Sequence, residues 1–214
     1  MKIVVFSSSN KVNSEIPEVI KMFENGLTCF HLRKPKLRLK ELDKYILAIP
    51  NEYRNRIILH THHELASLHS LKGVHHSRSY RKNRFSYSIK IGISKIIRNK
   101  LLFTRSYHSM VDVKKSLNIY DYIFLSPVFD SISKNYHKSS FGNGEIEKIL
   151  KSSNQNIYAL GGITPENAEK AFRMGFDGIG VLGYIWESDH TPLEAFLSIQ
   201  EKINQLKNQL SVAV

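Results

Sequence analysis

The sequence predicts an α/β fold in which a single (β/α)8 TIM barrel takes up nearly the whole chain. Two features of the 214 residues indicate it: eight short apolar runs rich in β-branched residues, and amphipathic segments with helical spacing between them. Such runs suit strands that are buried on both faces of a parallel sheet. Eight strands alternating with helices are typical of a closed barrel. Periodicity alone does not say whether the sheet closes, so a doubly wound open sheet is the alternative.

The eight predicted strands are separated by intervals that mostly leave room for a helix. They cover residues 3–8, 28–33, 56–61, 73–77, 101–106, 122–128, 157–163 and 178–185. The long interval between the fourth and fifth strands, residues 79–100, contains the run SYSIKIGIS, which suits either an extra strand or part of a basic loop.

The predicted helices carry end signals as well as amphipathic spacing. Residues 13–25 stop at Gly26, and Thr164 followed by Pro165 marks a helix start with proline at its first position. Further helices are predicted at 37–49, 109–117 and 191–209. We therefore expect one barrel domain over residues 1–208 and a frayed tail over residues 209–214.

Composition limits the class of partner. The 31 Lys and Arg against 19 Asp and Glu give a formal charge of +12, and residues 65–111 contain no acidic residue. Such a charge indicates an anionic partner. A nucleic-acid partner and a membrane are not expected, because the chain has no nucleic-acid-binding motif and no apolar run near the ~18–20 residues that span a bilayer. The apolar stretch at the start of the chain is too short for a signal peptide. Cys29 is the single cysteine, which excludes an intramolecular disulfide and fits a reducing compartment, so we expect a cytoplasmic protein.

The candidate site residues lie at the predicted strand ends, because parallel barrels carry their active sites at the carboxyl ends of the strands. These ends are rich in cations, hydroxyls and glycines, which together describe a phosphate site. The candidates are His31, Arg33, Lys34, His60, Ser106, Ser131, Ser133, Lys134, Gly161, Gly162 and Gly183.

Several of these features also have a plain structural interpretation. A Gly-Gly pair at a strand end is often only a tight turn. The histidines at 60–63 and 75–76 could bind a metal, but neighbours on a strand face opposite ways and the chain has 10 histidines, so we predict no metal site through them. Cys29, in a predicted strand, is expected to be a small core residue.

Six sequence segments resemble a known family. They are HLRKP, GVHHS, SYHS, DYIFLSPVFDSISK, ALGGITPEN and GFDGIGVLGYIW, within residues 3–186. Together they resemble thiamine-phosphate synthases and their relatives, the TenI-type thiazole tautomerases. The resemblance implies a (β/α)8 barrel of thiamine biosynthesis. The reaction it implies joins an aminopyrimidine-methyl diphosphate to a thiazole phosphate and releases pyrophosphate, with Mg²⁺ as cofactor.

The resemblance also implies residue roles. Arg33, Ser106 and Lys134 match diphosphate-binding positions and are the expected catalytic residues. The remaining candidates are expected to bind substrate: His31 stands for a glutamine, Lys34 flanks the place of a lysine, and Gly183 replaces a serine. The others in this group are His60, Ser131, Ser133, Gly161 and Gly162, the glycine pair matching the cradle for the thiazole phosphate.

The chain departs from the family at the metal ligands. The Asn-Asp pair after the third strand reads His60-Thr61, and the second metal-binding Asp falls near Tyr80, within the acid-free stretch. The basic residues Arg78, Arg81 and Lys82 would then neutralise the diphosphate in place of Mg²⁺. A tautomerase acting through histidine, and a non-catalytic phosphate-ligand binder, are the alternative functions. The sequence is compatible with a homo-oligomer.

Overall fold

The computed structural model describes residues 1–8, 12–77, 101–114, 120–130 and 141–212. Eight parallel strands close into a barrel in sequence order, with β1 pairing both β2 and β8. The strands are β1 (Lys2–Phe6), β2 (Phe30–Leu32), β3 (Ile57–Leu59), β4 (Gly73–His76), β5 (Leu102–Tyr107), β6 (Tyr122–Leu125), β7 (Ile157–Leu160) and β8 (Gly178–Val181). The predicted barrel is confirmed, and the open-sheet alternative is wrong because Lys2 lies opposite Gly178 in the closing pair.

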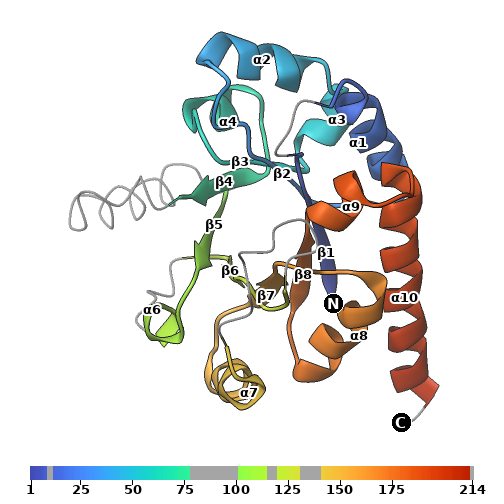
Figure 1. Ribbon diagram of the computed structural model, residues 1–214. Coiled ribbons are helices and arrows are strands. Elements are labelled where there is room, and N and C mark those ends of the chain that lie inside the picture. Colours follow the sequence, from blue (N-terminus) through green and yellow to red (C-terminus); the bar gives the residue numbers. More distant parts are fainter. Residues whose placement is uncertain (9–11, 78–100, 115–119, 131–140, 213–214) are drawn as a thin grey trace.

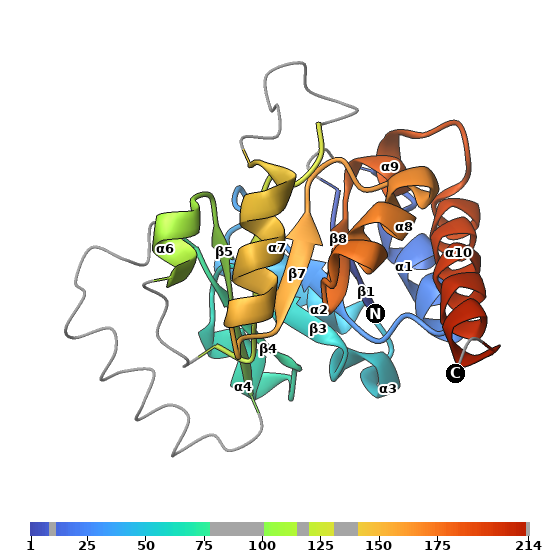
Figure 2. The ribbon, with the colours of Figure 1, turned by 90° about the horizontal axis from the view of Figure 1, so that it is seen from below.

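Helices surround the barrel on the outside (Figures 1 and 2). Their bounds are α1 (Glu15–Glu24), α2 (Leu39–Leu47), α3 (Asn51–Arg54), α4 (Glu64–Leu68), α6 (Met110–Lys114), α7 (Asn143–Ser152), α8 (Pro165–Met174), α9 (Gly183–Glu187) and α10 (Pro192–Val212). Helix α10 packs beside α1 and α8. Within the described residues the predicted helices are confirmed, whereas α3, α4, α7 and α9 were not predicted. Among the described helices, none is long and apolar enough to cross a membrane.

The last predicted strand, residues 178–185, extends beyond the observed strand β8. Residues 183–185 were assigned to it, but β8 ends at Val181 and Gly183 begins the short helix α9. The chain turns at Leu182, whose carbonyl accepts a hydrogen bond from the backbone N–H of Trp186 at 3.3 Å. The Trp186 indole N–H also donates to the Phe6 carbonyl at 2.7 Å, which ties α9 to the end of β1. The apolar run at residues 178–185 is therefore divided between β8 and the helix α9 that follows it.

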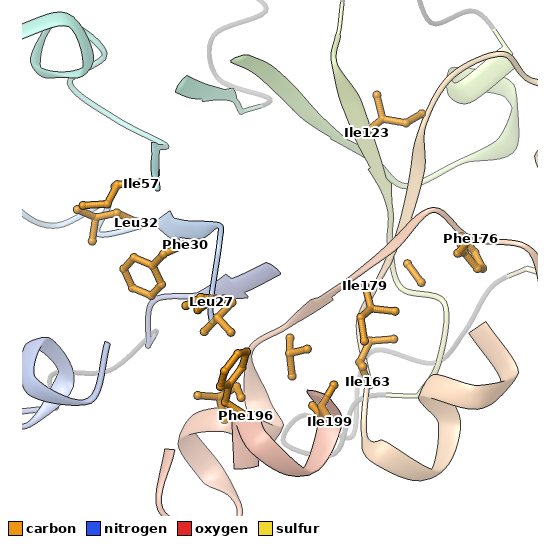
Figure 3. Close-up of a cluster of buried hydrophobic side chains, with 14 of the residues drawn as sticks. Leu27, Phe30, Leu32, Ile57, Ile123, Ile163, Phe176, Ile179, Phe196 and Ile199 are labelled. Carbon is orange, nitrogen blue, oxygen red and sulfur yellow. The ribbon is translucent and has the colours of Figure 1, made fainter. Parts of the chain in front are cut away.

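Side chains on the strands alternate between two cores, as the two-residue period of a strand requires. Phe30, Leu32, Ile57 and Ile179 point outward, and Figure 3 shows them in the layer that also contains Phe196 of α10. The alternate positions fill the barrel interior with Val4, Phe6, Cys29, Ile58, Tyr122, Phe124 and Tyr158. The interior is a packed core, and its inward positions continue toward the carboxyl ends of the strands.

Glycines on β8 make room for this interior core. A Cβ at Gly178 would lie 2.7 Å from Tyr158 Cδ2, and one at Gly180 would lie 2.9 Å from Phe124 Cε1. Such distances are too short for real Cβ contacts. Large rings on β6 and β7 are thus matched by two positions without side chains on β8, as close packing requires.

Candidate active site at the barrel mouth

Inward positions near the carboxyl ends of neighbouring strands carry polar side chains. His31 is on β2, His60 directly follows β3, His75 is on β4 and Ser106 is on β5. Each lies two residues beyond an interior position: Cys29 just before β2, Ile58 on β3, Gly73 on β4 and Thr104 on β5. The alternation that fills the barrel with apolar groups therefore places these polar groups together above them.

Three of the four polar side chains are histidines in mutual contact. His31 Nδ1 and His60 Nε2 are 2.9 Å apart, and the His60 and His75 rings stack with centroids 4.1 Å apart. The other nitrogen of His31, Nε2, lies 2.6 Å from the Tyr122 hydroxyl. The predicted substrate-binding residues His31 and His60 thus meet in the barrel interior.

His75 joins the cluster to Ser106. Its Nδ1 is 2.8 Å from Thr104 Oγ1 and its Nε2 is 3.2 Å from Ser106 Oγ. Ser106, an expected catalytic residue, is partly exposed. Its hydroxyl therefore lies between the buried histidines and the barrel mouth.

Burial fixes the charge of the three histidines. Desolvation lowers the pKa of His31 to about 3 and lowers the pKa values of His60 and His75 well below the ordinary value. The positive charge of Arg33 is a smaller cause for both His60 and His75. All three rings are therefore neutral at pH 7.

Arg33 follows β2 directly and is exposed. Its backbone is fixed by Ser7, which follows β1. The Ser7 hydroxyl accepts from the Arg33 N–H at 2.8 Å and is 3.1 Å from the Arg33 carbonyl, to which it donates. The stem of Arg33 is therefore held at the mouth while its guanidinium reaches solvent.

Lys34 is paired within the protein. Its ammonium lies 2.5 Å from Glu15 Oε2 of α1 and donates to the Ser8 carbonyl at 2.9 Å. Glu15 also accepts from the Ser8 N–H at 2.7 Å. Burial raises the pKa of the Glu15 carboxyl, and Lys34 opposes that rise. The sequence did not predict this pair, which joins the end of β2 to α1.

The glycine pair after β7 is required by the backbone. Gly161 and Gly162 have φ values of 98° and 65°. A Cβ at Gly161 would lie 2.9 Å from Pro127 Cα, and one at Gly162 would collide with the carbonyl of Asp130. The tight-turn interpretation is confirmed. The same turn leads into α8, where the Thr164 side chain accepts from the Asn167 N–H.

Several predicted residues cannot be placed in this geometry. Ser131, Ser133 and Lys134 lie outside the described residues, as do Arg78, Arg81, Lys82 and the run SYSIKIGIS. Gly183 lies at the start of α9 rather than within β8. Two interior residues, His75 and Tyr122, were absent from the predicted site. The i, i+2 spacing of Gly73 and His75 is the signal that could have placed His75 inside.

Cys29 belongs to the barrel interior, as predicted. Its thiol is buried and lies 3.4 Å from the Tyr122 hydroxyl, and burial raises its pKa to about 11. We expect iodoacetamide to leave Cys29 unmodified in the folded protein at pH 7.5 and to modify it fully in denaturant. Intact mass measured with and without denaturant checks this. Rapid alkylation of the folded protein would contradict the packing described.

The family model and the sequence relatives agree on one family. The family model described as thiamine monophosphate synthase matches residues 3–185. A thiamine-phosphate synthase of Staphylococcus haemolyticus is 32% identical over 189 residues, covering 81% of this chain and 82% of the relative. One of Anoxybacillus flavithermus is 36% identical over 87 residues, 40% of each chain. The crystal structure of thiamine phosphate pyrophosphorylase from Bacteroides thetaiotaomicron is similar with a TM-score of 0.76 and 25% identity, over 95% of this chain and 98% of that one.

Proposed function

Because the chain belongs to the thiamine monophosphate synthase family, we propose that its barrel mouth couples an aminopyrimidine-methyl diphosphate to a thiazole phosphate and releases pyrophosphate. The predicted role as a transferase of thiamine biosynthesis is confirmed by the family match. The observation that carries the proposed site is convergence: Arg33, Ser106 and the Gly161-Gly162 turn all follow or end strands at one end of a closed parallel barrel.

The proposed reaction exchanges one bond for another. The bond between the pyrimidine methylene carbon and a diphosphate oxygen breaks, and its electron pair leaves with the diphosphate. The thiazole nitrogen then forms the new bond to the methylene carbon. Negative charge grows on the leaving diphosphate, so cations and hydroxyl donors at that position lower the barrier.

We assign the developing charge to Arg33 and Ser106. Arg33 is exposed directly after β2, and the Ser106 hydroxyl lies 3.2 Å from His75 Nε2 near the end of β5. Ser131, Ser133 and Lys134, which lie outside the described residues, complete the proposed diphosphate contacts. Lys34 acts differently in this proposal: with its ammonium paired to Glu15, it positions the loop that follows β2.

The thiazole phosphate is assigned to the turn after β7 and the neighbouring start of α9. The positive φ values of Gly161 and Gly162 let the backbone approach a ligand closely, and Gly183 presents no side chain at the adjacent strand end. Holding the thiazole there would keep its nitrogen in position for attack.

Magnesium does not fit the described residues. The position after β3 where the family has a carboxylate carries His60-Thr61, and the second carboxylate position near Tyr80 lies outside the described residues. Mg²⁺ prefers oxygen ligands, whereas this part of the mouth offers imidazole nitrogens. No step of the proposed reaction is assigned to Mg²⁺.

The proposal is tested by incubating the purified protein with both substrates, with and without Mg²⁺, and measuring pyrophosphate release and thiamine phosphate. We expect product, and we expect omission of Mg²⁺ to reduce the rate less than tenfold. A folded protein that binds thiazole phosphate and forms no product would contradict synthase activity. That result would favour the tautomerase or the non-catalytic binder instead. A cytoplasmic location and a homo-oligomer are also part of the proposal, to be tested by fractionation and light scattering.

A further inference from the structure

The three neutral histidines in the barrel have a feature that diphosphate binding does not use. One ring nitrogen from each of His31, His60 and His75 can be chosen so that all three lie within 4.8 Å of one another. The residues are 0%, 6% and 3% exposed. The three side chains come from three neighbouring strands, so the opposite facing of neighbours on one strand does not separate them.

We propose that His31, His60 and His75 bind one divalent transition-metal ion, with Zn²⁺ as the best-fitting ion. Three imidazoles with one further position open are a recurrent donor set for zinc in proteins. Imidazole suits zinc and its neighbours in the first transition row, whereas Mg²⁺ selects oxygen. This site differs in donors and in metal from the carboxylate site that the resemblance implied.

The spacing is close to what coordination needs. Zn–N bonds of about 2.0–2.1 Å in a tetrahedral arrangement put ligand nitrogens roughly 3.3 Å apart. His31 Nδ1 and His60 Nε2 are 2.9 Å apart, joined by a hydrogen bond in which one ring donates. Metal binding would replace that bond after the donor ring moves its proton to its other nitrogen. The nitrogen of His75, which lies within 4.8 Å of the other two, would be brought to the same spacing by ring rotation.

Neighbouring side chains already orient two of the rings. His31 Nε2 lies 2.6 Å from the Tyr122 hydroxyl, which leaves Nδ1 for a metal. His75 Nδ1 lies 2.8 Å from Thr104 Oγ1, and its Nε2, now 3.2 Å from Ser106 Oγ, would exchange that contact for the metal. A hydrogen bond to the second ring nitrogen is the usual way in which proteins fix a metal-binding histidine.

The surroundings keep the rings in the form that binds metal. Phe6 and Phe124 pack against His31, with ring centroids 4.7 Å and 5.2 Å from it. This apolar setting keeps the imidazoles neutral at pH 7, and only neutral imidazole offers a lone pair. The inference does not depend on the proposed reaction, because the contacts belong to the protein alone.

Metal uptake by tag-free protein tests the proposal. Chelator-treated protein would be titrated with ZnCl2 by calorimetry, and separately with CoCl2 while recording the visible absorption spectrum. We expect one Zn²⁺ per chain and a Co²⁺ spectrum of tetrahedral or five-coordinate intensity. The spectrum reports coordination directly and does not require catalysis.

Variants separate this site from adventitious binding. Tyr122→Phe removes a hydrogen-bond partner of a proposed ligand and should weaken Zn²⁺ binding by ~10–100-fold. His60→Gln and His75→Gln each remove a proposed ligand and should weaken Zn²⁺ binding by more than that. His190→Gln, at an exposed histidine outside the cluster, should bind like the wild type. Failure of the wild-type protein to bind Zn²⁺ or Co²⁺ saturably would overturn the proposal. So would unchanged affinity in a folded His60→Gln or Tyr122→Phe protein.

Discussion

Replacing Arg33 with alanine should lower kcat/KM for thiamine phosphate formation by about 10²–10³-fold. The proposed transition state carries growing charge on the diphosphate, and removal of one preorganised donor to such charge costs about that factor. Arg33 suits the role because Ser7 fixes its backbone from both sides while its guanidinium stays exposed at the mouth. Most of the loss should be in kcat, since the charge develops during bond breaking. Steady-state kinetics with both substrates measures it.

A matched control removes an arginine from another exposed surface. Arg173, on α8, pairs with Glu169 at 2.8 Å, and its side chain is 67% exposed. Arg173→Ala should leave kcat/KM within about twofold, because exposed ion pairs contribute little. Equal kinetics for Arg33→Ala and Arg173→Ala would contradict the assignment of Arg33 to the diphosphate. A change confined to KM would mean that Arg33 binds the ground state and the transition state equally.

The barrel was predictable from the sequence because each strand is buried on both faces. Runs such as residues 56–61 and 122–128 contain continuous apolar segments, at 57–59 and 122–125, and the number of such runs indicated the topology. The end of β8 was not predictable in this way, since Ile185 continues the apolar run although it lies in α9. There, the Trp186 indole bond to Phe6 sets the boundary, and that contact joins residues 180 positions apart.

The site was only partly predictable for a similar reason. Arg33 and the Gly161-Gly162 turn could be found because they directly follow strands. The interaction of His31, His60 and His75 depends on the register among three strands. His31 lies opposite Ile58, and Ile58 lies opposite Gly73, so His60 and His75 are both two residues beyond the register position of His31. A single strand's alternation places each ring inside but does not show that rings from different register positions meet.

Replacing Phe124 with alanine should reduce the free energy of unfolding by about 3–5 kcal/mol, the range for a buried phenylalanine whose cavity cannot collapse. Phe124 is 0% exposed and packs at the centre of the barrel interior. Its ring lies edge-on to Phe6 at 5.2 Å and to Tyr158 at 5.8 Å, measured between centroids. The closed ring of strands resists contraction around the void. Urea unfolding followed by circular dichroism measures the change.

The control for Phe124 is an exposed leucine. Leu68, at the end of α4, is 71% exposed, so Leu68→Ala should shift the free energy of unfolding by less than about 0.5 kcal/mol. Phe124 also meets the space left by Gly180, where a Cβ would approach its Cε1 to 2.9 Å. Gly180→Ala alone should therefore destabilise the protein, because the new methyl group would collide with the Phe124 ring. Once Phe124→Ala has removed that ring, adding Gly180→Ala should recover part of the lost free energy of unfolding. Additive losses in the double variant would show that the two positions do not share one packed interior.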